Sequence, residues 1–186
     1  MKLLKIAILA SGRGSVIPRI IEAIDNKQLN AEIAIIVSNK ADAKVLELAK
    51  SYNIEAKHIS SEQLISQTLK QHNIELILLI GYMKILSHAF VDEWRNRILN
   101  VHPSLLPAFA GLKDLNLHQA VLKAGVKETG CTVHLATEEL DAGPILLQKK
   151  CSVYVTDTPQ TLKQRVQKLE GEALVEAIKK WQEEYG

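Results

Sequence analysis

The sequence predicts a single α/β domain with a mostly parallel, twisted sheet and helices on both faces. In the first two thirds of the 186 residues, short apolar runs alternate with amphipathic segments of helical period. This rhythm is typical of a parallel sheet with right-handed crossovers. The run Leu76–Ile80 is wholly apolar, as expected of a central strand covered on both faces. The length suits one domain, so we expect residues 1–186 to form a single unit.

The N-terminal part is expected to hold four strands and three helices. In the first helix Ile17, Ile20, Ile21 and Ile24 recur at helical spacing, and Pro18 is tolerated because it falls in the first turn. The expected strands are Lys5–Ala10, Ile33–Val37, Ile54–Ile59 and Leu76–Ile80, and the expected helices are Ser15–Asp25, Ala43–Tyr52 and Ser61–His72, with Ser61 as its cap.

The C-terminal part is expected to add helices and an antiparallel hairpin around a turn at Asp141-Ala142-Gly143. A long final helix should begin at Thr158, which precedes Pro159. The expected elements are helices at His88–Trp94, Leu117–Ala124 and Thr158–Tyr185, and strands at Ile98–His102, Cys131–Thr137 and Ile145–Val155.

Composition excludes several function classes. The formal net charge is +2, from 23 basic and 21 acidic residues without a polybasic run, so nucleic acid is not an expected partner. No apolar stretch approaches the ~20 residues that span a membrane. The N-terminal apolar run is short and interrupted by Lys5, which favours a strand over a signal peptide. Two cysteines are too few for a disulfide framework, which fits a reducing compartment, so we expect a cytoplasmic protein. The sequence does not decide between a monomer and a homodimer.

A glycine-rich turn, Ser11-Gly12-Arg13-Gly14-Ser15, lies between the first expected strand and helix. Backbone amides at such a junction favour an anion, and glycine lets a phosphate approach closely. The turn matches neither the dinucleotide pattern nor a Walker A loop, because Ile17 occupies the last glycine position and no Gly-Lys-Ser/Thr follows. It therefore favours a monophosphate, with a ligand-free tight turn as the alternative.

The segment Asn100-Val101-His102 sets an amide and an imidazole on one face of an extended chain, and Asp141 follows on a turn bounded by Gly143 and Pro144. These groups suit acyl transfer: a donor for a developing oxyanion, a proton shuttle and a carboxylate partner. A carboxylate beside the ring favours the imidazolium, so we expect Asp141 to raise the pKa of His102.

Five separated segments resemble, in order, those of the folate-dependent phosphoribosylglycinamide formyltransferase family. They are Ala10–Ser15, Val37–Ala43, Gly81–Ser87, Arg97–Pro107, and Gly130–His134 with Leu140–Pro144. The run from His102 to Pro107 is shared with other formyl-folate enzymes, among them methionyl-tRNA formyltransferase and formyltetrahydrofolate deformylase. The glycine-rich turn and the short chain favour the glycinamide member.

The resemblance implies a cytoplasmic enzyme of purine synthesis, with a Rossmann-like formyltransferase domain. It would move the formyl group of 10-formyltetrahydrofolate, its co-substrate, to the amine of glycinamide ribonucleotide without a metal. Asn100, His102 and Asp141 would be catalytic. A 10-formyltetrahydrofolate hydrolase, or a formyltransferase for a different amine, is the alternative.

The resemblance also implies two binding regions. The substrate phosphate and ribose would meet Gly14, Ser15, Val16, Gln167 and Glu170, with Glu170 on the ribose hydroxyls. The folate would meet Met83, Lys84, Ile85, Leu86, Asn100, Thr137, Glu138, Glu139, Leu140 and Asp141.

The chain departs from the family at binding positions. Val16 stands where asparagine is usual, and Gly171 replaces a common histidine. An arginine-bearing stretch that reaches the cofactor in some members is missing near Lys57–Leu64, which leaves open whether Lys84 replaces that cation. For His134, orientation of the site and plain core packing remain open. The other histidines, His58, His72, His88 and His118, are expected at the surface or in packing.

Overall fold

The computed structural model describes residues 2–186 and confirms the predicted α/β class. Its seven-stranded sheet has the order β3-β2-β1-β4-β5-β6-β7. The first five strands pair in parallel, whereas β6 and β7 add antiparallel. The strands are β1 (Leu4–Leu9), β2 (Ala31–Ser38), β3 (Ala56–His58), β4 (Leu76–Leu79), β5 (Ile98–His102), β6 (Glu128–Leu135) and β7 (Ile145–Ser152).

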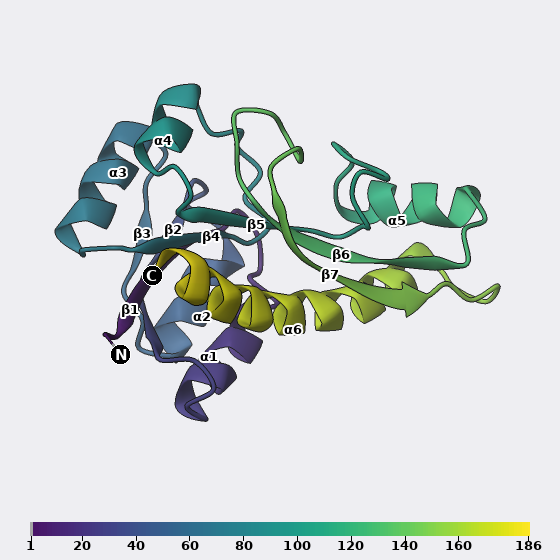
Figure 1. Ribbon diagram of the computed structural model, residues 1–186, viewed down its shortest axis with the longest axis horizontal. Coiled ribbons are helices and arrows are strands. Elements are labelled where there is room, and N and C mark those ends of the chain that lie inside the picture. Colours follow the sequence, from purple (N-terminus) through teal and green to yellow (C-terminus); the bar gives the residue numbers. More distant parts are fainter. Residues whose placement is uncertain (1) are drawn as a thin grey trace.

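Helices cover both faces of this sheet (Figure 1). One apolar layer joins the strands to α1, α2, α5 and α6, and a second joins them to α3 and α4. The helices are α1 (Ile17–Asp25), α2 (Lys44–Ser51), α3 (Glu62–Gln71), α4 (His88–Glu93), α5 (Asp114–Lys123) and α6 (Pro159–Tyr185). The strand order reverses direction between β1 and β4, and in open α/β sheets the crevice at such a reversal is the usual ligand site.

Side-chain caps mark the starts of α3 and α6. The hydroxyl of Ser61 accepts a bond from the Leu64 amide and caps α3 as predicted. Thr158 and Thr161 form a reciprocal capping box at the start of α6. Every residue of β4 is buried, as expected of a strand with helices on both sides.

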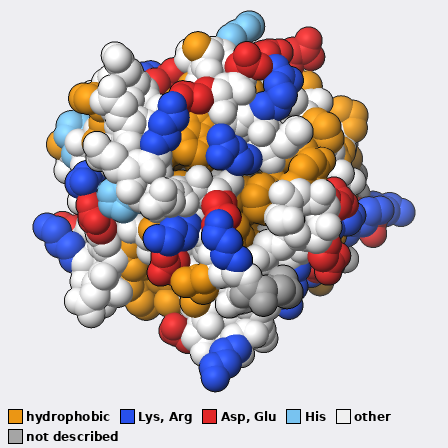
Figure 2. Space-filling model, turned by 60° about the vertical axis from the view of Figure 1, so that its left-hand side comes forward, with side chains coloured by type: hydrophobic (Ala, Val, Ile, Leu, Met, Phe, Trp, Pro, Cys, Tyr) orange, Lys and Arg blue, Asp and Glu red, His pale blue; other side chains and the backbone are white. Residues whose placement is uncertain are grey.

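Figure 2 shows acidic and basic side chains interspersed on one face of the molecule.

Several boundaries differ from the sequence prediction, and the starts of α5 and β6 both lie before the predicted Leu117 and Cys131. Helix α5 begins at Asp114, one turn before the predicted Leu117, and its N-cap residue Lys113 makes no side-chain cap. The first turn of α5 has neither a capping side chain nor a clear apolar periodicity, so its start could not be predicted from the sequence. The predicted hairpin forms from β6 and β7, with residues 136–144 as its connection.

Candidate functional site

A cavity of about 530 Å³ lies where the predicted site segments meet, at the reversal of strand order. Loops that follow β1, β4 and β6, the end of β5 and one face of α6 all contribute to its wall. Every residue that the sequence analysis assigned to a catalytic or binding role lines this cavity. The structure thus brings together groups far apart in the chain, while their individual roles stay predictions.

The glycine-rich loop forms the end of the cavity next to the start of α1. Gly14 has φ +69, and a Cβ there would lie 2.7 Å from Ile17 Cδ1 and 2.8 Å from Val45 Cγ2. The amide of Val45 also donates to the carbonyl of Gly12 at 3.0 Å. Glycine is therefore required at position 14 by both backbone conformation and packing. The loop is a fixed cradle at a helix N-terminus, which suits an anion.

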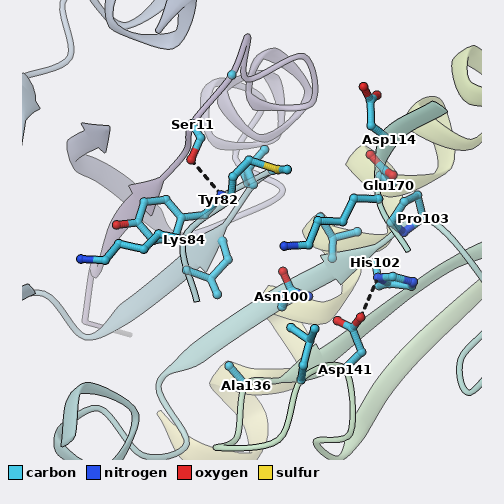
Figure 3. Close-up of a pocket in the computed structure, with 18 of the residues that line it drawn as sticks. Ser11, Tyr82, Lys84, Asn100, His102, Pro103, Asp114, Ala136, Asp141 and Glu170 are labelled. Carbon is cyan, nitrogen blue, oxygen red and sulfur yellow. Dashed lines mark hydrogen bonds and ion pairs between the residues drawn. The ribbon is translucent and has the colours of Figure 1, made fainter. Parts of the chain in front are cut away.

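Ser11 ties this loop to the opposite wall of the cavity. Its buried hydroxyl donates to Asn39 Oδ1 at 2.6 Å and accepts from the Met83 amide at 2.8 Å. Figure 3 shows Ser11 directed toward the segment that carries Tyr82. The carboxyl ends of β1, β2 and β4 are thereby held together by one side chain that the sequence analysis had noted only as part of a turn.

Asn100, His102 and Asp141 converge on the cavity from β5 and from the β6–β7 connection (Figure 3). Asp141 Oδ2 lies 3.3 Å from His102 Nδ1, and both side chains are almost wholly buried. The same carboxylate oxygen accepts from the Gly111 amide at 2.9 Å. His102 Nε2 lies 3.3 Å from the carbonyl of Phe109. An amide, an imidazole and a carboxylate thus border one space.

Asp141 raises the pKa of His102 as expected, but the net shift of this pKa is downward. Burial lowers the pKa of His102 below its usual value, because the charged ring loses hydration. Asp141 and the carbonyl of Phe109 oppose this effect and Lys113 adds to it, but none outweighs burial. A neutral imidazole is therefore the prevailing form near neutral pH, which suits a group that accepts a proton.

His134 lies next to this cluster, 2% exposed. Its Nε2 is 3.0 Å from Asn100 Nδ2, and its Nδ1 is 2.9 Å from the carbonyl of Leu135. Burial lowers the pKa of this ring as well. Both ring nitrogens therefore have directed polar partners, beyond what packing requires.

The part of the cavity walled by α5 and α6 contains two groups that sequence reasoning missed, Lys163 and His118, beside the predicted Glu170. Lys163 forms an ion pair with Asp114 and lies one helical turn before Gln167, so α6 and α5 are linked beside the cavity. Glu170 is almost wholly buried, and this burial raises its pKa to about 7, against the opposing effect of Lys163. His118 was expected at the surface or in packing; it is buried, with an unpartnered Nδ1, and lines the cavity. The i, i+4 spacing of Lys163 and Gln167 was the available signal.

Lys84 lies on the expected folate wall, but its ammonium group is directed elsewhere. It donates to the carbonyl of Ser60 at 3.0 Å and lies 3.8 Å from Glu62 Oε1. Met83 and Ile85 on either side are exposed apolar side chains. This wall offers apolar surface to a flat ligand, with the cation at its edge.

Within residues 2–186, no group of three or more His, Cys, Asp or Glu side chains is arranged to hold a metal ion. In the same part of the chain, no helix combines the length and the apolar composition needed to cross a membrane.

Sequence comparison matches residues 4–178 to the family described as "Formyl transferase". A phosphoribosylglycinamide formyltransferase of Bacillus subtilis is 38% identical over 175 residues, which cover 89% of this chain and 88% of that protein. A trifunctional purine biosynthetic protein adenosine-3 of Gallus gallus is 42% identical over 183 residues. The match covers 94% of this chain but 18% of that protein's length.

Solved structures of phosphoribosylglycinamide formyltransferases are also similar to this chain. A phosphoribosylglycinamide formyltransferase from Brucella melitensis has a TM-score of 0.89 and 39% identity, with 97% of this chain and 96% of that chain covered. One from Anaplasma phagocytophilum has a TM-score of 0.90 and 37% identity, covering 95% and 85%. A formyltetrahydrofolate deformylase from Pseudomonas syringae, 24% identical with a TM-score of 0.86, shares the fold.

Proposed function

This chain belongs to the formyl transferase family, and we propose that it transfers the formyl group of 10-formyltetrahydrofolate to the amine of glycinamide ribonucleotide in purine synthesis. The single observation that carries the proposal is one cavity that joins a glycine-rich anion cradle to the cluster of Asn100, His102 and Asp141. A phosphorylated amine and a formyl donor would meet there. We propose the cytoplasm as its location, and residues 1–186 as one formyltransferase domain.

Asn100 and His102 supply complementary functions for this reaction. The nucleophilic amine forms a bond to the formyl carbon, and the carbonyl oxygen becomes an oxyanion. An N–H of the Asn100 amide stabilises that charge in a site shielded from water. His102, neutral because of burial, accepts the proton that the amine loses and returns a proton to the departing folate nitrogen as the second C–N bond breaks. Protons and charge then balance without another reactant.

Asp141 serves this cycle through its contact with His102 Nδ1 at 3.3 Å. While His102 holds the extra proton, the carboxylate stabilises the imidazolium that burial disfavours. The Gly111 amide fixes the carboxylate from the other side. Asp141 therefore matters most in the charged intermediate, where its attraction acts on a full positive charge.

The two substrates bind different parts of the cavity. Gly14 and Ser15 offer backbone amides to the phosphate, and Gln167 and Glu170 of α6 face the ribose. The loops at Met83–Leu86 and Thr137–Asp141 accept the folate. Glu170, with its pKa raised to about 7, can donate as well as accept a hydrogen bond toward ribose hydroxyls.

Acceptor dependence tests the proposal. Purified enzyme is incubated with 10-formyltetrahydrofolate alone, with glycinamide ribonucleotide, or with glycinamide riboside, and release of tetrahydrofolate is followed. Release that requires the ribonucleotide and falls sharply with the riboside supports the proposed transfer and its phosphate cradle. Equal release without any acceptor would favour a hydrolase, and transfer only to another amine would change the acceptor.

A further inference from the structure

We propose that His134 is a positioning residue that holds the carboxamide of Asn100 in one orientation, with an N–H free for the formyl oxygen. This inference rests on the proposed function for its effect on rate. The tautomer of His134 and the orientation of the Asn100 amide do not depend on the proposed function, because they follow from hydrogen bonds within the protein.

The sheet register places the two side chains together. Asn100 of β5 and His134 of β6 are direct partners in the antiparallel pair. Residues at such opposed positions project to the same side of a sheet with their Cβ atoms close. His134 also lines the cavity, so an interaction between the two lies at the edge of the reaction space.

The partner of His134 Nδ1 fixes the tautomer of the ring. That nitrogen lies 2.9 Å from the carbonyl oxygen of Leu135, and a carbonyl only accepts hydrogen bonds. Nδ1 must therefore carry a proton. Burial lowers the pKa of His134 and outweighs the opposing effects of the Leu135 carbonyl and Asp141, while His102 acts in the same direction as burial. A neutral ring protonated on Nδ1 has a lone pair on Nε2.

That lone pair fixes the amide of Asn100 in turn. His134 Nε2 lies 3.0 Å from Asn100 Nδ2, so the amide nitrogen donates to it. A flipped amide would place its oxygen against the lone pair with no hydrogen between them, which is repulsive. One N–H of Asn100 is thus committed to His134, and the second N–H remains for a ligand in the cavity that Asn100 lines.

The same tautomer separates the roles of the two buried histidines around Asp141. His134 Nε2 is 3.8 Å from Asp141 Oδ1, but an unprotonated nitrogen makes no ion pair with a carboxylate. Asp141 therefore remains directed to His102 and the Gly111 amide. His102 moves the proton, whereas His134 keeps its own.

Packing alone does not explain these contacts. His118 is equally buried, yet its Nδ1 has no hydrogen-bond partner among the described residues. His134 has a directed partner on each ring nitrogen, one of them a side chain assigned to the oxyanion. This contrast favours orientation of the site over core filling, the two possibilities that the sequence left open.

The first test reads the tautomer without any substrate. Long-range ¹H–¹⁵N correlation spectra of enzyme labelled with ¹⁵N-histidine distinguish a ring protonated on Nδ1 from one protonated on Nε2. His134→Gln assigns the resonance. Near neutral pH we expect a neutral His134 with its proton on Nδ1. A proton on Nε2, in either the other neutral tautomer or a charged ring, would overturn the proposal whatever the enzyme's substrates are.

The second test asks whether His134 acts through Asn100. In His134→Leu we expect kcat to fall about 10- to 100-fold, the size of effect that small misplacement of a catalytic group produces, with a much smaller change in KM for the folate. His134→Gln should recover part of the loss, because its amide oxygen can accept from Asn100. In an Asn100→Ala background, His134→Leu should cost nothing further, since interacting residues are not additive.

Controls keep these outcomes distinct. His72→Gln changes the C-cap residue of α3, whose ring contacts the Thr68 carbonyl and Glu55 away from the cavity, and it should leave kcat unchanged. Thermal unfolding checks that each variant is folded, and if the Leu variant is not, the Gln variant and the tautomer decide. Equal losses in the wild-type and Asn100→Ala backgrounds would contradict the proposal. A wild-type enzyme that transfers no formyl group would contradict the proposed function instead, and the tautomer of His134 could still be measured.

Discussion

The carboxylate of Asp141 reaches His102 Nδ1 at 3.3 Å from a residue whose own backbone is in the left-handed region, with φ +55. The β6–β7 connection thus adopts an uncommon conformation for a residue other than glycine, and this conformation places the acid beside the ring. The arrangement links a strand-end imidazole to a carboxylate 39 positions away in the sequence.

Asp141→Asn tests this pair through the pH profile. Because Asp141 raises the pKa of His102 while burial lowers it, removal of the charge should lower that pKa further. We expect the acid limb of kcat/KM to move to lower pH, and the plateau value to fall on the order of 100-fold, within the range of acid–base contributions. An acid limb that stays in place or moves to higher pH would contradict the pairing.

Glu170→Gln should stabilise the protein in alkaline solution while weakening acceptor binding. The folded-state pKa is raised from 4.5 to about 7, so the protonated group's contribution is complete below 4.5 and is lost as pH rises through 7. The variant should therefore unfold at a higher temperature than wild type at about pH 8 and at a similar one at about pH 5.

The kinetic half of the Glu170 prediction is a raised KM for glycinamide ribonucleotide with an unchanged KM for the folate. Glu172→Gln, an exposed position on the same helix, is the matched control for charge. A stability gain in Glu170→Gln that is the same at both pH values would show that ionisation of Glu170 is not the cause.

Val16→Asn exchanges packing for a polar contact. Val16 is 5% exposed in the main apolar layer and also lines the cavity, and its backbone already has helical angles without a cap bond. We expect a lower KM for the ribonucleotide, because an amide can reach its phosphate, together with a stability loss of about 1–2 kcal/mol from lost apolar burial. Val16→Ala should lose stability without lowering the KM. A raised KM in Val16→Asn would contradict a phosphate contact at this position.

Gly14→Ala should disrupt the cradle. The new methyl group would overlap Ile17 and Val45 at a positive φ, so the loop must shift. We expect both a lower unfolding temperature and a higher KM for the ribonucleotide. Gly12→Ala is the stability control, because a Cβ there meets nothing within 4 Å. If the two variants were equally stable, the cradle would not depend on close packing.

Much of this architecture was accessible from the sequence, for reasons that particular segments illustrate. The apolar run at β4 and the isoleucine periodicity of α1 directly reflect burial, so strands and helices were predicted in the correct order. The glycine-rich turn and the β6–β7 connection, which the sequence singled out by their glycine and turn residues, both line the cavity.

What could not be predicted depends on balances in three dimensions. The pKa of His102 follows from burial competing with Asp141, and sequence alone showed only the carboxylate. The placement of His118 and the Lys163–Asp114 pair depends on how α5 packs on α6, two helices separated by the whole hairpin. The role of His134 depends on cross-strand register, which no local pattern near that residue specifies.

The most direct measurement of the central claim is a single-turnover rate for His102→Ala with both substrates saturating, beside its dissociation constant for the folate. We expect the rate of formyl transfer to fall about 10²- to 10⁴-fold, the loss of a proton shuttle, while folate affinity is nearly retained. A rate close to that of the wild-type enzyme, with the folate bound equally well, would show that the chemistry takes place without this imidazole and would contradict the account.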